Sequence, residues 1–312
     1  MNASAPGFVL PRPLRGWAER TAGALLQPPN GPQVSFLLPA GEPALAAADS
    51  VTWQVFKNPL VLFVGGVAAV LLELAEPRVR AGVWDHTTFR TDPMRRLQRT
   101  GLAAMVVVYG ARSTAEALIA GVGRAHARVE GRTAEGVAYR ASDPALLDWV
   151  QATASFGFLE AYCAYVRPLP APDRDSFYAE GAPAARLFGA AGAPRSCREM
   201  TTLLDAMRPK LGGSAVIPEF LAIMRRAPIL PSALRPVQGL LLRAAVGVVP
   251  GWARDLLGLG ASWRLRRWET RLLRAAGALA DRVQLDGSPP VQACLRLGLP
   301  AGALYAPRGR AT

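Results

Sequence analysis

Residues 92–127 read DPMRRLQRTGLAAMVVVYGARSTAEALIAGVGRAHA, and this stretch decides the fold class. Asp92 followed by Pro93 is a typical helix start, because Asp caps free amide groups and Pro lacks the N–H that a first turn leaves unbonded. The apolar residues that follow recur at three- and four-residue spacing. We therefore expect helices over 93–109 and 114–127. The turn between them is so short that they should be antiparallel neighbours.

Local signals place the next elements along the chain. Ser113 and Glu116 have the spacing of a capping box, with Ser113 as the cap of the second helix. Asp143 precedes another proline and predicts a third helix, over 144–166. Between the second and third helices, residues 128–141 contain two glycines at turn positions and predict a small β-hairpin.

The rest of the chain extends the same helical pattern. Residues 43–285 alternate Ala-, Leu- and Arg-rich runs with Pro or Gly breaks, whereas 1–42 and 286–312 are rich in Pro and Gly. The apolar run 59–72 is shorter than the roughly 20 residues of a membrane span, so a buried core helix is expected. The sequence predicts an all-α, single multi-helix domain over 43–285, with an irregular arm before it and an irregular tail after it.

Composition and charge limit the partners. Hydrophobic residues make up 51% of the 312, enough for a large core, and 36 basic against 23 acidic residues give a net charge of +13. A basic surface suits anionic partners such as phospholipid headgroups. Nucleic acid is not expected, since Lys is nearly absent and no zinc-finger or RNA-binding motif is found.

The cysteines and the N-terminal sequence bear on location. Cys163, Cys197 and Cys294 are far apart and odd in number, so no disulfide framework is expected, and free thiols fit a reducing cytosol. No secretory signal is visible at the N-terminus. We expect a cytoplasmic protein, with peripheral contact to an anionic membrane left open.

One basic and aromatic stretch leaves two interpretations open. Trp263 and Trp268 flank Arg264, Arg266 and Arg267. Such a stretch can touch a membrane surface, whereas a solvated helix face is the more ordinary interpretation.

The candidate site combines a histidine with a basic cluster. Arg96, Arg99 and Thr100 stand at i, i+3 and i+4 of the first helix, and His126 lies about as far from the turn in the second helix, roughly 15–20 Å. An antiparallel pair would set them at one depth, where they could hold a metal and orient oxygen-derived groups. The ordinary alternatives are a core histidine and a solvated basic face. His86, the other histidine, is expected to be a hydrogen-bonding partner in a loop.

A series of motifs in this order resembles the MpaB and rubber-oxygenase catalytic domain family, which includes the latex clearing proteins. The similarity covers about residues 45–285. The matching segments are 71–77, 82–83, 86–93, 95–100, 126–131, 136–139 and 143–153.

The resemblance implies roles for five residues. His126 matches the proximal haem ligand of that family and would bind the iron. Arg96 and Thr100 match the Arg and Thr of a distal Arg-x-x-Lys-Thr motif, and Arg99 stands in place of its Lys. An arginine does not readily lose the proton that iron ligation requires, whereas a buried lysine can. Gln151 replaces a histidine that relatives carry, and it is expected to contribute to the haem pocket.

The resemblance also implies a function. It predicts a globin-like helical core that binds haem b and uses dioxygen to oxidise a hydrophobic, unsaturated or isoprenoid-like substrate. The alternative is a non-catalytic lipid-binding or membrane-associated protein of the same fold.

Overall fold

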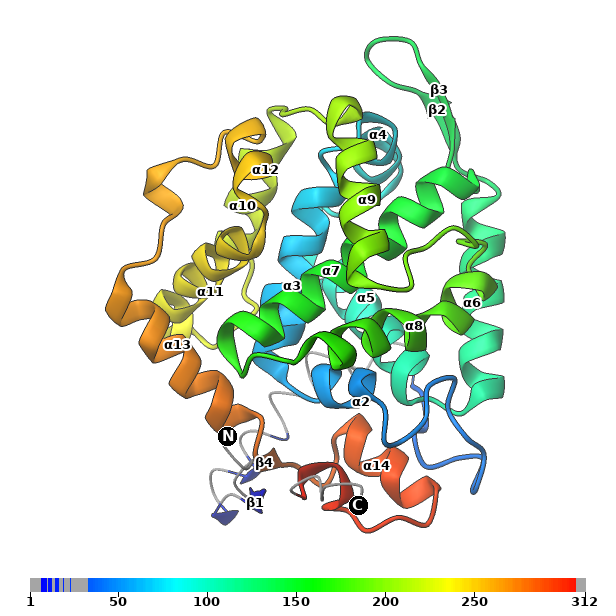
Figure 1. Ribbon diagram of the computed structural model, residues 1–312, viewed down its shortest axis with the longest axis vertical. Helices are drawn as coiled ribbons and strands as arrows, with labels where there is room; N and C mark the ends of the chain where they lie inside the picture. The colour runs from blue at the N-terminus through cyan, green and yellow to red at the C-terminus, as the bar shows by residue number, and fades with distance from the viewer. Residues whose placement is uncertain are drawn as a thin grey trace.

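The computed structural model describes residues 7–9, 11, 12, 15, 16, 19, 23 and 33–306, and it is built almost entirely of helices (Figure 1). The helices are α2 (Val51–Phe56), α3 (Pro59–Glu73), α4 (Pro77–His86), α5 (Pro93–Tyr109), α6 (Arg112–His126), α7 (Pro144–Tyr165), α8 (Ala171–Leu187), α9 (Cys197–Met207), α10 (Val216–Arg226), α11 (Arg235–Val248), α12 (Gly251–Leu256), α13 (Arg267–Ala280) and α14 (Pro289–Arg296). The strands are β1 (Phe8–Val9), β2 (Glu130–Arg132), β3 (Ala138–Arg140) and β4 (Val283–Gln284). A mostly helical single domain is therefore confirmed.

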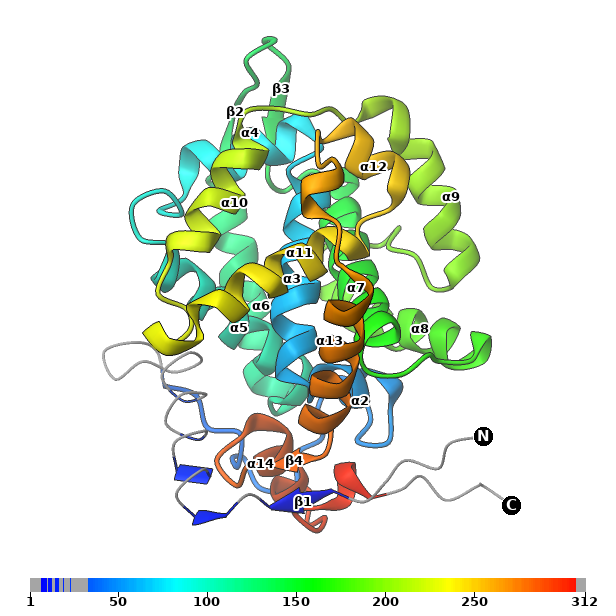
Figure 2. The same ribbon diagram turned by 90° about the vertical axis from the view of Figure 1, so that its left-hand side faces the viewer.

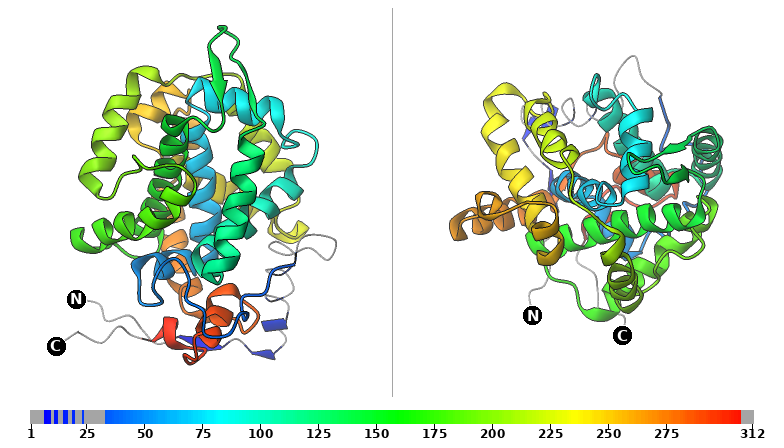
Figure 3. Two further views of the ribbon diagram at one scale, coloured as in Figure 1. Left: turned by 90° about the vertical axis from the view of Figure 1, so that its right-hand side faces the viewer. Right: turned by 90° about the horizontal axis from the view of Figure 1, so that it is seen from above.

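Helix α3 is the central helix of the domain. It packs mainly on α7 and α11, and Figure 2 shows it behind α11 and α13. Seen from above in Figure 3, it lies in the middle of the surrounding helices. Asn58 starts it by accepting from the amides of Leu60 and Val61, and Pro59 takes the first helical position. Its apolar run is buried protein core, because most of its side chains contact other helices.

The crossing of α3 and α7 is unusually close. A Cβ atom on Gly157 would lie 2.4 Å from the carbonyl oxygen of Gly65 and 3.0 Å from the amide of Ala69, so only glycine allows the two backbones to touch. This contact fixes how the helices align. Glu73 lies four residues after Ala69 on α3, and Thr153 lies four residues before Gly157 on α7.

No single described helix is long and apolar enough to cross a membrane. Helices α3 and α4 together have sufficient length and composition, but they are bent by 112° at their junction. The bend arises where the carboxylate of Glu76 caps the amide of Val79 and Pro77 begins a new helix.

The predicted hairpin of α5 and α6 is present, but its second helix begins differently than expected. Asp92 caps α5, accepting from the amide of Arg95 at 3.1 Å. The capping box predicted at Ser113 is wrong, because α6 begins at Arg112 with no side-chain cap. The Ser113 amide and hydroxyl instead donate to the carboxylate of Glu42, at 2.6 and 2.9 Å. Glu42, which is distant in the sequence, therefore accepts the hydrogen bond from the Ser113 amide that a capping box would give to Glu116.

The β-hairpin predicted over 128–141 is confirmed. Strands β2 and β3 are antiparallel, with Gly131 opposite Tyr139. The Tyr139 hydroxyl lies 3.1 Å from Nε2 of His86. His86 therefore has the hydrogen-bonding part expected of it, although it is the last residue of α4 rather than a loop residue.

The described parts of the two terminal segments contain regular secondary structure. Most of residues 1–32 lies outside the described residues, but β1 pairs in parallel with β4. The tail predicted to be irregular from 286 contains α14, so that prediction is wrong for 289–296. Its two prolines occupy the first helical turn, where a missing N–H costs nothing. Val291 and Cys294 of α14 are buried in the main core.

Candidate functional site

The basic cluster predicted on α5 is divided by the structure. All three residues lie in the first two turns of the helix, but Arg96 is half-buried, whereas Arg99 and Thr100 are exposed. Burial lowers the pKa of Arg96, the nearby carboxylate of Glu73 raises it, and the charge of Arg99 lowers it. The effect of Glu73 identifies Arg96 as the member of the cluster that faces an acid.

His126 is the last residue of α6 and is half-buried. Its pKa is lowered by burial and, to a smaller degree, by the charge of Arg96. The structure thus brings His126 and Arg96 into electrostatic contact from the two arms of the hairpin. Both effects favour the neutral imidazole, which is the form that can bind a metal.

Glu73 is the residue that sequence reasoning missed. It ends the apolar helix α3, and burial raises its pKa from 4.5 to about 7, against the opposing effects of the Arg96 charge and a hydrogen bond with Thr153. Its carboxyl group therefore gains and loses a proton near neutral pH. The sequence carries a signal for it, because Glu73 is the first charged residue after fifteen uncharged ones.

Thr153 connects Glu73 to helix α7. Its side chain is fully buried, and its hydroxyl lies 3.0 Å from the carbonyl oxygen of Trp149 and 2.9 Å from that of Val150. The close crossing at Gly157 and Gly65 places this hydroxyl opposite the end of α3. The glycine contact is thus the reason that Glu73 has a partner on α7.

Gln151 lies on a different side of α7 from Thr153. It is half-buried, and its side chain forms no hydrogen bond in the part of the chain that the structure describes. Two residues of separation in a helix turn the side chains about 200° apart. The structure therefore does not join Gln151 to the cluster of Glu73, Arg96 and His126.

Half-buried positions recur at helical spacing on three helices. They lie at intervals of three or four residues, as one face of a helix requires. They are Leu62, Gly66, Val70 and Glu73 on α3; Leu118, Val122 and His126 on α6; and Gln151, Ala154 and Phe158 on α7.

Glycines leave room beside two of these faces. The nearest atom to a Cβ placed on Gly66 would be a ring carbon of Phe158 at 4.0 Å. On α6, a Cβ on Gly123 would meet nothing within 4 Å, and one on Gly121 would meet only Arg124, at 3.7 Å. The backbone next to His126 is therefore open to the approach of another group.

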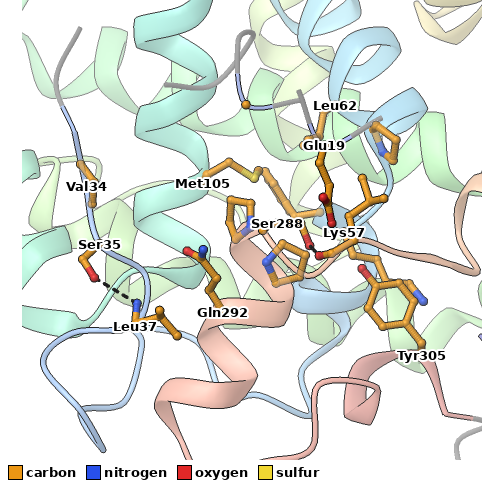
Figure 4. A pocket seen from close by; sticks show the side chains of 17 residues that line it. Glu19, Val34, Ser35, Leu37, Lys57, Leu62, Met105, Ser288, Gln292 and Tyr305 are labelled. Atoms are coloured by element: carbon orange, nitrogen blue, oxygen red, sulfur yellow. Dashed lines mark hydrogen bonds between the residues drawn. The ribbon is translucent and has the colours of Figure 1, made fainter. Parts of the chain in front are cut away.

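A cavity of about 430 Å³ lies at the opposite end of α3 (Figure 4). Its lining is mostly apolar and includes Leu62 of α3, Met105 of α5 and Gln292 of α14. Lys57, which also borders it, is paired with Asp281 at 3.3 Å. Leu62 and Glu73 belong to the same half-buried face of α3, with Leu62 at the cavity and Glu73 at the other end of the helix.

Within residues 33–306 and the described part of the arm, no three His, Cys, Asp or Glu side chains gather as they would around a metal ion. His126 is the candidate metal ligand, and the three cysteines are free thiols.

Comparison with known proteins identifies one family. The model of the family described as ER-bound oxygenase mpaB/B'/Rubber oxygenase, catalytic domain, matches residues 53–282. The match includes α3, α5, α6 and α7, which carry the candidate site. No curated protein and no solved structure matches the chain.

Proposed function

The chain belongs to the mpaB and rubber-oxygenase catalytic domain family, and from this premise we propose that it is a haem-b-dependent oxygenase that acts with dioxygen on a hydrophobic, unsaturated or isoprenoid-like substrate. Membership in the family implies an oxygenase. The haem, the residue roles and the substrate class are our proposal. One observation carries it: Glu73, at the end of the otherwise uncharged helix α3, interacts electrostatically with Arg96, and Arg96 with His126.

The residues around His126 fit haem as the cofactor. Haem needs one axial donor from the protein on its proximal side, and a neutral imidazole supplies it. Gly121 and Gly123 carry no side chain, so at these positions α6 does not block the approach of a flat group to His126. When bound, haem supplies a redox-active iron for dioxygen chemistry. We propose that α3, α5, α6 and α7 form the globin-like core around it.

The other members of the cluster supply a proton-exchanging group and a fixed positive charge. Glu73, with a pKa of about 7, holds or releases a proton at its carboxyl group under physiological conditions. Arg96 cannot lose its proton and holds a permanent positive charge beside Glu73, suited to orienting an oxygen-derived anion. Thr153, the buried hydroxyl next to Glu73, lowers the pKa of that carboxyl group against the effect of burial.

Three predicted residues receive supporting roles. Thr100 offers a hydroxyl to the same side as Arg96. Arg99 contributes positive charge and is not an iron ligand, because guanidinium stays protonated. Gln151, which faces away from the side of α7 that carries Thr153, would contribute its amide to a part of the pocket wall separate from Glu73, where relatives have a histidine.

We propose that an extended apolar substrate lies along α3. Its half-buried face runs from Leu62 to Glu73, about 16 Å at 1.5 Å per residue, and the 430 Å³ cavity adjoins its far end. Gly66 lies in the middle of this face with space beside it. Gly66→Leu should therefore slow the oxidation of long isoprenoids more than that of short ones, as dioxygen consumption would show. Equal rates for both lengths would contradict this path.

The central test uses the two histidines of the chain. We expect the purified protein to show the Soret band of haem, and His126→Ala to lose or strongly shift it. His86→Ala is the matched control, because His86 is bonded to Tyr139 rather than placed in the cluster, and it should keep the band. A colourless protein that fails to take up added haem would overturn the proposal.

The cavity beside Leu62 also suits the second candidate, a lipid-binding protein without catalysis. That protein would bind fatty or isoprenoid ligands with no chromophore. The same absorption spectrum separates the two functions.

A further inference from the structure

Helix α13 presents three large apolar side chains to solvent. Trp268, Leu272 and Leu279 are 56%, 52% and 53% exposed. They are spaced by four and seven residues, so they form one stripe along the helix. In Figure 2, α13 lies on the near side of the molecule, in front of α7 and α3. We call these three residues the α13 stripe.

The opposite face of α13 is firmly attached to the domain. Glu269 is buried, and its carboxylate pairs with both terminal nitrogens of Arg243 on α11. A Cβ on Gly277 would lie 2.2 Å from the carbonyl oxygen of Tyr165, so α13 touches the end of α7. The α13 stripe is therefore held outward by a well-packed helix.

The charges beside the stripe have one sign. Residues 261–280 contain five arginines and a single acid, Glu269, which is already paired inside. Arg264, Arg267 and Arg271 are exposed, and within the described residues none of them has an acidic partner. Arg267 and Arg271 lie along one side of the stripe by helical geometry.

We propose that α13 is a docking helix for the surface of a bilayer that contains anionic phospholipid. A tryptophan and two leucines on one face are the side chains that enter the boundary between headgroups and acyl chains, and flanking arginines bind headgroup phosphates. The outer face of α13 takes no part in the proposed oxygenase site.

The chemistry of the surface favours a bilayer over two other occupants. A second copy of the chain would bring arginine rows of like charge together around a two-fold axis. A nucleic acid would match the arginines but would leave the α13 stripe without an apolar partner. An anionic bilayer satisfies both the charge and the apolar surface.

Vesicle binding tests the docking helix directly. We expect the full-length protein to sediment with phosphatidylcholine vesicles that contain phosphatidylglycerol, and much less with phosphatidylcholine alone. Arg267→Glu with Arg271→Glu should weaken this binding at least about tenfold. Leu272→Ser with Leu279→Ser should weaken it by a similar factor. The fluorescence of Trp268, followed as the difference from Trp268→Phe, should shift to the blue on binding.

A matched control separates docking from general hydrophobicity. Leu187 at the end of α8 is 47% exposed, and Leu187→Ser should leave vesicle binding unchanged. Circular dichroism and haem uptake should be the same in all variants, so a failure of the docking proposal differs from a failure of the proposed function. Vesicle binding that is insensitive to the α13 variants would overturn the inference. Loss of self-association or of RNA binding in those variants, with vesicle binding intact, would also overturn it.

Discussion

The two ends of helix α5 each meet an arginine, and the two arginines are used in opposite ways. At the C-terminal end, Arg296 of α14 donates to the carbonyl oxygens of Tyr109, Phe36 and Glu42 at 2.8, 3.0 and 2.9 Å. At the N-terminal end, Arg96 faces the carboxyl group of Glu73 and the imidazole of His126. Arg296 is bonded to backbone carbonyls and lies near the carboxylate of Glu42, whose pKa is lowered by hydrogen bonds from Ser113 and, to a smaller degree, by the charge of Arg296, whereas Arg96 faces Glu73, whose pKa is raised to about 7.

This difference shows how to separate a structural cation from a functional one. Both arginines have a pKa lowered by burial, so the pKa shift alone does not distinguish them. Their partners do. Backbone carbonyls accept hydrogen bonds at every pH, whereas Glu73 changes its charge near neutrality. We therefore expect substitutions at the two positions to affect different properties.

The largest expected effect is on stability, at the C-terminal end of α5. Arg296→Met removes the donor to two buried carbonyl oxygens and one partly buried one, and we expect the free energy of unfolding to fall by about 3–5 kcal/mol. Urea denaturation followed by circular dichroism measures it. Arg296→Lys should recover only part of the loss, because an ammonium group cannot reproduce the forked geometry. A loss below about 1 kcal/mol in Arg296→Met would show that Arg296 does not have the structural role assigned to it.

The next effect depends on pH at the other end. Folding raises the pKa of Glu73 from 4.5 to about 7, so the folded state keeps its proton more tightly than the unfolded state does. Parent stability should therefore decrease as pH rises from about 4.5 to about 7, and Glu73→Gln should avoid this loss. At about pH 8 we expect the variant to be more stable than the parent by up to about 3 kcal/mol, at 1.36 kcal/mol per pKa unit. Denaturation at both pH values measures the difference.

The control for Glu73 is another acid on the surface. Glu116 is exposed on α6, and Glu116→Gln should show no such dependence on pH. Equal stabilisation of Glu73→Gln at about pH 4 and about pH 8 would show that Glu73 is not a proton-exchanging group.

The smallest expected effect on stability comes from Arg96→Met. We expect a change of about 1 kcal/mol or less in the free energy of unfolding. Arg96 is only half-buried, and its removal leaves no set of buried carbonyl oxygens without hydrogen-bond donors. Dioxygen consumption with an unsaturated isoprenoid should instead fall by at least about tenfold. If Arg96→Met lowers the free energy of unfolding as much as Arg296→Met does, both arginines are structural and the proposed difference between the two ends of α5 is wrong.

Much of the hairpin that carries the site could be predicted from the sequence, because its signals are local. Asp92, Pro93 and Asp143 marked helix starts that the structure has, and the hairpin near Gly131 was expected from its turn residues. The juxtaposition of the two hairpin arms followed from counting residues back from one short turn.

The rest depends on contacts between distant parts of the chain. The carboxylate that accepts from the amide and hydroxyl of Ser113 belongs to Glu42, 71 residues away, and no local rule identifies it. Glu73 acquires its raised pKa from burial against α7, which depends on the touching glycines 65 and 157. Helix α14 was not predicted, because prolines are typical both of irregular chain and of a first helical turn, and only its packing on the core distinguishes the two.

The position of Arg296 also has a consequence for the order of folding during synthesis. Its three acceptors belong to residues 36, 42 and 109, all of which leave the ribosome long before residue 296 does. Until then, the closing end of the α5–α6 hairpin must remain hydrated or be held by a chaperone. We expect nascent chains arrested before α14 to be digested by protease near this end, and chains arrested well after it to resist.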